Sequence, residues 1–163
     1  MLNILHHYFG TKLLNKIDPE ISHAIALCYL RLLNQFVKKK EIGDSILKTQ
    51  IAGMEVPSPI GLAAGFDKNA EVFNATLSLG FGFVEVGTIT PDPQFGNPKP
   101  RLFRLLEEDA LVNKMGFNNK GMLYVSKIAR KPKIGIVGVN LGANAKSIDK
   151  ILDYTNVFEF LAH

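Results

Sequence analysis

The sequence predicts an α/β fold built around a parallel sheet. Residues 60–64, 81–90 and 134–141 are apolar runs of strand length, and a helical pattern follows each of them along the chain. The run at 81–90 is almost continuously apolar, which is typical of a strand buried on both faces of a parallel sheet. Strands that alternate with helices favour βαβ units, in which the crossover helices cover the sheet.

Length and composition fit one ordinary globular domain. The chain has 163 residues, of which 47% are hydrophobic and 21% charged, and these values exclude collagen-like, low-complexity and largely disordered classes. The one cysteine, Cys28, excludes an intramolecular disulfide framework, and its apolar surroundings predict a buried thiol. None of the four histidines has metal-ligand spacing with cysteine or carboxylates, so no metal site is predicted.

Two helices are predicted at the N-terminus, followed by a lysine-rich linker. Residues 2–14 carry apolar side chains at helical spacing. Asp18 followed by Pro19 is typical of the start of a second helix, which runs to about residue 37. The second helix carries one apolar face, widened by three leucines: Ile21, Ile25, Cys28, Leu32 and Phe36, with Leu27, Leu30 and Leu33 beside them.

The net charge of +4 comes entirely from the first 40 residues, which carry six Lys or Arg and two acidic residues. A basic, apolar helix pair of this kind either packs on the domain that follows, lies on a membrane with its basic residues at the rim, or presents a solvated face. Its longest apolar run, 24–33, is too short to span a bilayer, and no signal peptide is recognisable. Residues 41–163 balance at 13 basic and 13 acidic residues without an aromatic-basic stripe, which argues against nucleic acid as a partner.

The remaining elements alternate between strands, hairpins and helices. A short hairpin is predicted around Ala52 and Gly53, and a second one around Asp109. Pro and Gly punctuate the loop at 91–100. In chain order the expected elements are the hairpin strands 49–51 and 54–56, strand 60–64, helix 70–79, strand 81–90, hairpin strands 101–105 and 110–114, helix 119–130, strand 134–141, and helix 147–161 with Ile148, Ile151, Leu152 and Phe158 on one side.

Polar residues and glycines follow each predicted core strand, where ligands bind in folds of this type. Lys68 offers a cation after the first strand, in a loop whose small residues let a flat ligand approach the backbone. Thr88 offers a hydroxyl after the second strand, and Asn140 an amide within the third. Each residue also has a plain alternative: a surface lysine, filler at a strand end, and an amide satisfied by the fold itself.

The segment 113–119 adds three amides and a glycine, which suit an amide- or imide-bearing ligand as well as a polar loop that ends in a helix cap. No phosphate-binding loop, nucleophile elbow or Ser-His-Asp arrangement is recognisable. By residue type, the set therefore favours binding of a planar polar ligand over hydrolysis.

Taken together, these segments are far more specific than any one of them. The stretches 59–69, 80–91, 96–105 and 113–119 closely resemble the quinone-dependent (class 2) dihydroorotate dehydrogenases. Residues 138–144 resemble the next strand and loop of that family. Asp18, Pro19, Glu20 and His23 resemble its N-terminal helical extension.

The resemblance implies a TIM (β/α)8 barrel, of which the first half is present. Residues 1–45 then form a helical extension and linker that associates with the membrane and the quinone, and residues 46–163 form the N-terminal half of an FMN-binding barrel. The implied activity is FMN-dependent oxidation of dihydroorotate to orotate, with a membrane quinone as electron acceptor, in pyrimidine biosynthesis. The implied location is peripheral, on the cytoplasmic face of the bacterial inner membrane, with the N-terminal helices on the membrane surface.

The resemblance also assigns residues, position by position. It implies that Lys68 contacts both the flavin and the substrate carboxylate, and that His23 and Arg104 line the quinone tunnel. The implied FMN contacts are Ala64, Gly65, Phe66, Asp67, Lys68, Thr88 and Asn140. The implied substrate contacts are Lys68, Asn113, Lys114, Met115, Gly116 and Phe117.

The implied catalytic serine lies in a family segment beyond His163, as do the loops for the FMN phosphate, so no catalytic residue is assigned within this chain. Removing the extension leaves 163 − 45 = 118 residues, against the roughly 250 of a complete barrel. We therefore expect the chain alone to be inactive, and marginally stable because apolar strand edges and helix faces are exposed. The alternative is a non-catalytic remnant that acts as a membrane-associated or partner-binding half-barrel.

Overall fold

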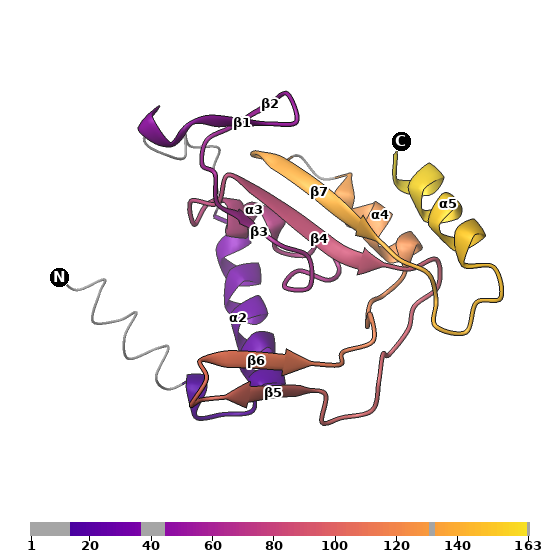
Figure 1. Cartoon of the computed structure of the whole chain (residues 1–163). Helices are drawn as coiled ribbons and strands as arrows, with labels where there is room; N and C mark the ends of the chain where they lie inside the picture. The colour runs from indigo at the N-terminus through magenta and orange to yellow at the C-terminus, as the bar shows by residue number, and fades with distance from the viewer. Residues whose placement is uncertain (1–13, 37–44, 131–132, 163) are drawn as a thin grey trace.

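A three-stranded parallel sheet forms the centre of the molecule. The computed structural model describes residues 14–36, 45–130 and 133–162. Strand β4 (Phe83–Ile89) lies between β3 (Gly61–Leu62) and β7 (Ile136–Leu141), and both neighbours run parallel to it. The order of these strands along the chain is visible in Figure 1. The predicted parallel sheet is therefore confirmed.

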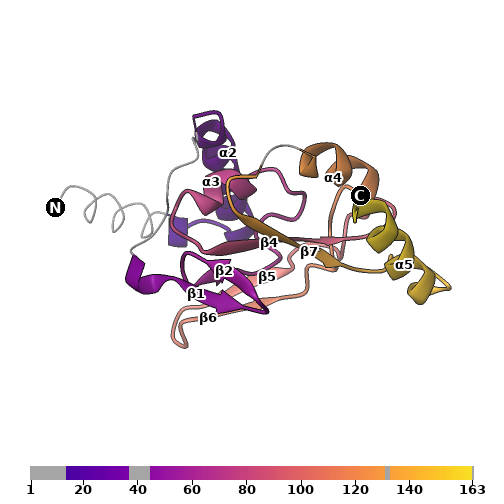
Figure 2. The ribbon, with the colours of Figure 1, turned by 90° about the horizontal axis from the view of Figure 1, so that it is seen from above.

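Helices cover one face of this sheet. Val84 and Val86 of β4 are fully buried against α3 (Phe73–Leu77), α4 (Met122–Ala129) and α5 (Lys150–Leu161), which contribute Leu77, Val125 and Val157 to the same core. Figure 2 shows α3 and α4 on one side of β4 and β7. Because side chains alternate along a strand, the residues between the buried valines point to the opposite face of the sheet.

Helix α3 is shorter than the predicted 70–79, for a local reason. The carboxylate of Asp67 accepts hydrogen bonds from the backbone amides of Glu71 and Val72, at 2.8 Å each, and Ala70 has a φ of +57°. These contacts hold residues 70–72 in a tight turn, so the helix begins only at Phe73.

Helix α2 (Pro19–Asn34) begins where the sequence predicts. Asp18 caps it, because its Oδ1 accepts hydrogen bonds from the amides of Glu20 at 2.9 Å and Ile21 at 3.0 Å. The helix packs on Val72 and Ala75 through Leu27, Leu30 and Leu33. The predicted helix at 2–14, apart from its last residue, and the linker at 38–40 lie outside the described residues.

The stripe marked by Cys28 faces outward, so the prediction of a buried thiol is wrong. A helix packs on one neighbour along one stripe, and the leucines at 27, 30 and 33 occupy that position. The exposed fractions of Ile25, Leu32 and Phe36 are 48%, 58% and 78%. Helix α2 therefore has an apolar face on the protein and a second, open apolar face.

Two antiparallel hairpins flank the sheet, as predicted. Strands β1 (Thr49–Ile51) and β2 (Met54–Val56) are joined through Ala52 and Gly53, both with positive φ. Strands β5 (Leu102–Leu105) and β6 (Ala110–Asn113) form the second hairpin, beside the first turns of α2 in Figure 1. A short 3₁₀ helix, η1 (Ser45–Leu47), precedes β1. Among the described helices, none is both long enough and apolar enough to cross a membrane.

Candidate functional site

A cavity of about 680 Å³ lies at the carboxyl ends of β3 and β4, between α2 and the β5–β6 hairpin. Residues from four separate parts of the sequence form its walls. Twelve of them are Ser22, His23, Ala64, Gly65, Phe66, Lys68, Thr88, Arg104, Asn113, Met115, Gly116 and Phe117. The structure thus brings most of the residues assigned to flavin, substrate and quinone around one space.

Three of the assigned residues do not line this cavity. Asp67 is buried within its own loop, with 1% of its surface exposed. Lys114 is exposed, and its backbone amide donates to the carbonyl of Arg101 at 2.9 Å. Asn140 lies behind Thr88, whose hydroxyl it contacts.

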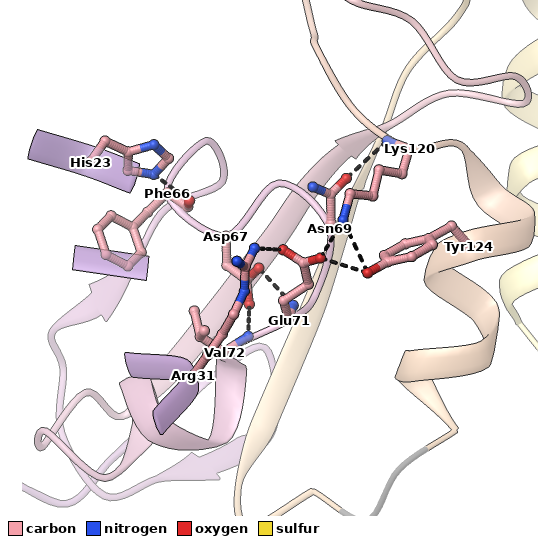
Figure 3. Close-up of polar contacts among 9 residues, drawn as sticks. All are labelled: His23, Arg31, Phe66, Asp67, Asn69, Glu71, Val72, Lys120 and Tyr124. Atoms are coloured by element: carbon pink, nitrogen blue, oxygen red, sulfur yellow. Dashed lines mark hydrogen bonds and ion pairs between the residues drawn. The ribbon is translucent and has the colours of Figure 1, made fainter. Parts of the chain in front are cut away.

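The loop after β3 is held in place from both ends. The amide of Gly65 donates to the carbonyl of Gly87 at 2.8 Å, and the amide of Gly87 donates back to the carbonyl of Asp67 at 3.0 Å. The Asp67 carboxylate faces inward onto backbone amides, as Figure 3 shows. Burial raises the pKa of Asp67, against the opposing effect of the Val72 and Glu71 amides. Asp67 therefore shapes the loop from inside, while its neighbours Phe66 and Lys68 face the cavity.

Lys68 places a cation in the cavity wall. Its Nζ donates to the carbonyl of Gly65, which folds the side chain back over its own loop. Burial lowers the pKa of Lys68, and the positive charge of Arg101 lowers it further. A partly desolvated ammonium of this kind favours an anionic or electron-rich group on a ligand.

His23 joins α2 to the same loop. Its Nε2 lies 2.7 Å from the carbonyl oxygen of Phe66, and its ring meets the Phe66 ring edge-on at 5.3 Å between centroids. A carbonyl oxygen only accepts, so Nε2 carries the proton of the neutral ring. Burial lowers the pKa of His23 and favours that neutral form. Figure 3 shows this contact at one end of the loop.

At the other end of the loop, Glu71 binds three side chains. Its carboxylate accepts hydrogen bonds from Arg31 of α2, from Lys120 at 2.7 Å and from the Tyr124 hydroxyl of α4 at 2.6 Å (Figure 3). Burial opposes ionisation of Glu71, but the hydrogen bonds from Lys120, Tyr124 and Arg31 outweigh it and lower its pKa. Sequence reasoning did not find this cluster, because no local pattern relates positions 31, 71 and 120.

Two arginines attach the β5–β6 region to α2. Arg104 donates to the carbonyl of Ile17 at 2.5 Å and to the hydroxyl of Ser22 at 3.2 Å, at the edge of the cavity. Arg101, which is 7% exposed, pairs with Glu20 at 2.6 Å and lowers the pKa of that carboxyl through this hydrogen bond. Arg101 also donates to the carbonyl of Asn97 at 3.0 Å. The pairing of Glu20 with Arg101 is a second feature that sequence reasoning missed.

The segment 113–119 is shaped by an amide of its own. The side chain of Asn119 donates to the carbonyl of Phe117 at 2.7 Å and to the hydroxyl of Thr90 at 2.8 Å. Gly116 and Phe117 have φ values of +75° and +52°, so the backbone turns sharply here. Both residues also line a neighbouring cavity of about 850 Å³, formed with the loops around 92–97 and 143–147.

In the described parts of the chain, no group of three or more His, Cys, Asp or Glu is placed to hold a metal ion. Ala64 and Gly65, in the same loop as Lys68, suit a flat ring, and Thr88 and Asn113 supply polar atoms around it. The residues present therefore fit a planar cofactor with an electron-rich edge.

The fold and this site define a class, that of α/β proteins with a parallel sheet and a ligand cavity at the carboxyl ends of its strands. The family model described as dihydroorotate dehydrogenase matches residues 46–163. The chain therefore belongs to the dihydroorotate dehydrogenase family.

Relatives with known names agree with this assignment. The chain is 50% identical over 156 residues to "Dihydroorotate dehydrogenase (quinone)" of Rhodopseudomonas palustris, covering 94% of this chain and 42% of that protein. It is 52% identical to the protein of the same name from Bartonella tribocorum, covering 90% of this chain and 40% of the relative. The chain thus spans about two fifths of the length of these relatives.

A solved structure shows the same fold. The crystal structure of DHODH from Eimeria tenella in complex with ferulenol superposes with a TM-score of 0.79 at 37% identity, covering 88% of this chain and 41% of that one. The predicted fold class, the first part of a (β/α)8 barrel, is confirmed by this likeness and by the parallel sheet.

Proposed function

We propose that this chain contributes the flavin-facing, substrate-facing and quinone-facing elements of FMN-dependent oxidation of dihydroorotate to orotate, with a membrane quinone as acceptor. The observation that carries the proposal is the cavity, which joins residues of three proposed subsites that lie far apart in the sequence. The names of the relatives support dihydroorotate as the substrate and a quinone as the electron acceptor.

The proposed division of labour follows the walls of the cavity. Gly65 and Thr88 lie where a flat ring meets the ends of β3 and β4, and Lys68 lies beside them as the cation for the substrate carboxylate. Bound FMN supplies the hydride-accepting chemistry, and the residues of this chain bind and orient it. Asn113 and the turn at Gly116 and Phe117 close the space from the hairpin side. No serine of this chain lies in the family's catalytic motif, so we propose that residues 1–163 alone do not remove the substrate proton.

The proposed quinone route enters from α2. His23 and Arg104 face the cavity from the helix and from the hairpin. We propose that the open face of α2, with Ile21, Ile25 and Leu32 about half exposed, lies on the membrane surface. The proposed location is therefore peripheral, on the inner membrane. Residues 1–45 are the proposed extension, and residues 46–163 the proposed barrel portion.

A flavin titration tests the core of the proposal. Purified chain is titrated with FMN, and binding is followed by quenching of flavin fluorescence. We expect saturable binding that orotate perturbs, and at least roughly tenfold weaker orotate binding in Lys68→Met, because a charge-assisted contact is lost. Lys48→Met, outside the cavity, is the matched control. If neither FMN nor orotate binds, the non-catalytic alternative is favoured, and dihydroorotate turnover by the chain alone would contradict the proposed missing base.

Vesicle flotation tests the membrane surface separately. We expect binding to anionic lipid vesicles to fall in the double variant Ile25→Glu with Leu32→Glu, because both side chains lie on the open face of α2. Leu47→Glu changes a side chain of similar exposure, 46%, elsewhere on the surface and should leave flotation unchanged. Equal loss with Leu47→Glu would contradict the assignment of α2 as the membrane face.

A further inference from the structure

Glu85 lies on the face of the sheet opposite the helices and belongs to no proposed subsite. It stands on β4 between the buried Val84 and Val86, level with Gly138 on β7. Two residues further along, Gly87 is level with Asn140, so Glu85 and Asn140 share this face of the sheet. The Nδ2 of Asn140 donates to Oε1 of Glu85 at 3.1 Å.

A second hydrogen bond continues from this pair to the cavity. The hydroxyl of Thr88 donates to Oδ1 of Asn140 at 2.7 Å, and Thr88 lines the cavity while Glu85 and Asn140 do not. The three side chains thus form a single row, which runs from the sheet face to the ligand space.

The chemistry of the three groups gives the row a direction. An ionised carboxylate only accepts hydrogen bonds, so Asn140 must turn its NH₂ group toward Glu85 and its carbonyl oxygen toward Thr88. That oxygen only accepts, so the single hydroxyl proton of Thr88 must point to Asn140. The lone pairs of the Thr88 oxygen are then left to face the cavity.

We propose that Glu85 is a positioning residue that acts through Asn140 to make Thr88 a hydrogen-bond acceptor, so that the cavity selects a planar ligand with a ring N–H. The proposal rests on the proposed flavin site, which it deepens. Oxidised FMN carries one ring N–H group, at N3, and reduction adds a further ring N–H. The Thr88 oxygen can accept a hydrogen bond from either of these N–H groups.

The direction of the row is tested first without any ligand. In NMR spectra of the labelled chain, we expect nuclear Overhauser contacts from the side-chain NH₂ protons of Asn140 to the γ protons of Glu85. Glu85→Lys replaces an acceptor with a donor and should reverse the amide, so that the NH₂ contacts move to Thr88. Glu85→Gln can still accept and should keep the wild-type pattern. NH₂ protons that contact Thr88 in the unchanged chain would overturn the proposal, whether or not flavin binds.

Flavin affinity then tests the selection. We expect Glu85→Lys to change one of two affinity ratios by roughly threefold to tenfold, the effect of one hydrogen bond. A lower ratio of FMN to N3-methyl FMN identifies the N3 proton as the partner. A lower ratio of dithionite-reduced to oxidised FMN identifies an N–H formed on reduction.

The controls separate this inference from the proposed function. Glu55→Gln, at an exposed position of β2, should leave both ratios unchanged, and Glu85→Gln should resemble the unchanged chain. Folded Glu85→Lys that binds flavin with both ratios unchanged would refute the selection. Failure of every variant and of the unchanged chain to bind FMN would instead refute the proposed function, and the NMR contacts would still decide the direction of the row.

Discussion

Asp67 and Lys68 are adjacent in the loop after β3, but their side chains point in different directions and have different roles. Asp67 turns inward and uses its carboxylate on two backbone amides, while Lys68 turns toward the cavity. His23 contacts this loop from α2 and is held neutral by burial. The position of Lys68 therefore depends on Asp67, which lies outside the cavity wall, and on His23, which is part of that wall.

The neutral state of His23 predicts a pH effect on stability. Burial holds its pKa below the ordinary value of 6.5, so the unfolded chain binds a proton more readily than the folded chain. The contribution of His23 is therefore fully present above pH 6.5 and is lost as the pH falls below it. We expect the free energy of unfolding, measured by urea denaturation, to fall less between pH 7.5 and 5.5 in His23→Gln than in the unchanged chain. Equal losses in both proteins would contradict this account.

At the scale of elements, α2 is attached to the rest of the molecule by polar contacts at several points along its length. Glu20 pairs with Arg101, His23 meets Phe66, Arg31 meets Glu71, and Asn34 accepts from the Ala75 amide at 3.0 Å. Two of these contacts fall on the loop 65–71, at its two ends (Figure 3). A shift of α2 would therefore act directly on the proposed flavin loop.

The Glu71 cluster predicts an asymmetric response to substitution. The side chain of Glu71 is 8% exposed, whereas those of Arg31 and Lys120 are each 48% exposed. Glu71→Ala leaves the Tyr124 hydroxyl and two cations without their shared acceptor, and we expect a loss of about 1–3 kcal/mol in the free energy of unfolding. Arg31→Met and Lys120→Met each leave one cation on Glu71, and we expect losses below about 1 kcal/mol. Chemical denaturation measures the free energy of unfolding of all three variants. A larger loss in either Met variant than in Glu71→Ala would contradict the role of Glu71 as the shared acceptor.

At the scale of the whole molecule, many large apolar side chains of the described residues are exposed to solvent. Helix α5 buries Val157 against the sheet but exposes Ile151 at 80% and Phe158 at 62%. The apolar stripe that the sequence marks on 147–161 is therefore the open side of this helix. Large exposed apolar faces favour self-association of a protein in water.

Because this surface is exposed, we expect charged substitutions on it to change the solubility of the protein without changing its stability. We expect Ile151→Lys with Phe158→Lys to raise the soluble yield and lower binding of the dye ANS, because both side chains lie in solvent. The free energy of unfolding should change by no more than roughly 0.5 kcal/mol, as for ordinary surface substitutions. Val157→Lys, at a site with 0% exposure, is the contrasting variant and should unfold the chain. A drop in stability from the double variant would place the stripe in the core instead.

Local spacing was enough to establish the order of strands and helices, both hairpin turns, the start of α2 at Asp18 and the family resemblance of the loops, because each depends on residues close together in the sequence. Only tertiary structure decided which stripe of α2 packs, that Asp67 turns inward, and that Glu20 meets Arg101 across 81 positions. The same holds for Glu71 and for the row of Glu85, Asn140 and Thr88. These contacts join segments that are distant along the chain, and a buried polar group takes whichever partner the folded backbone brings within reach.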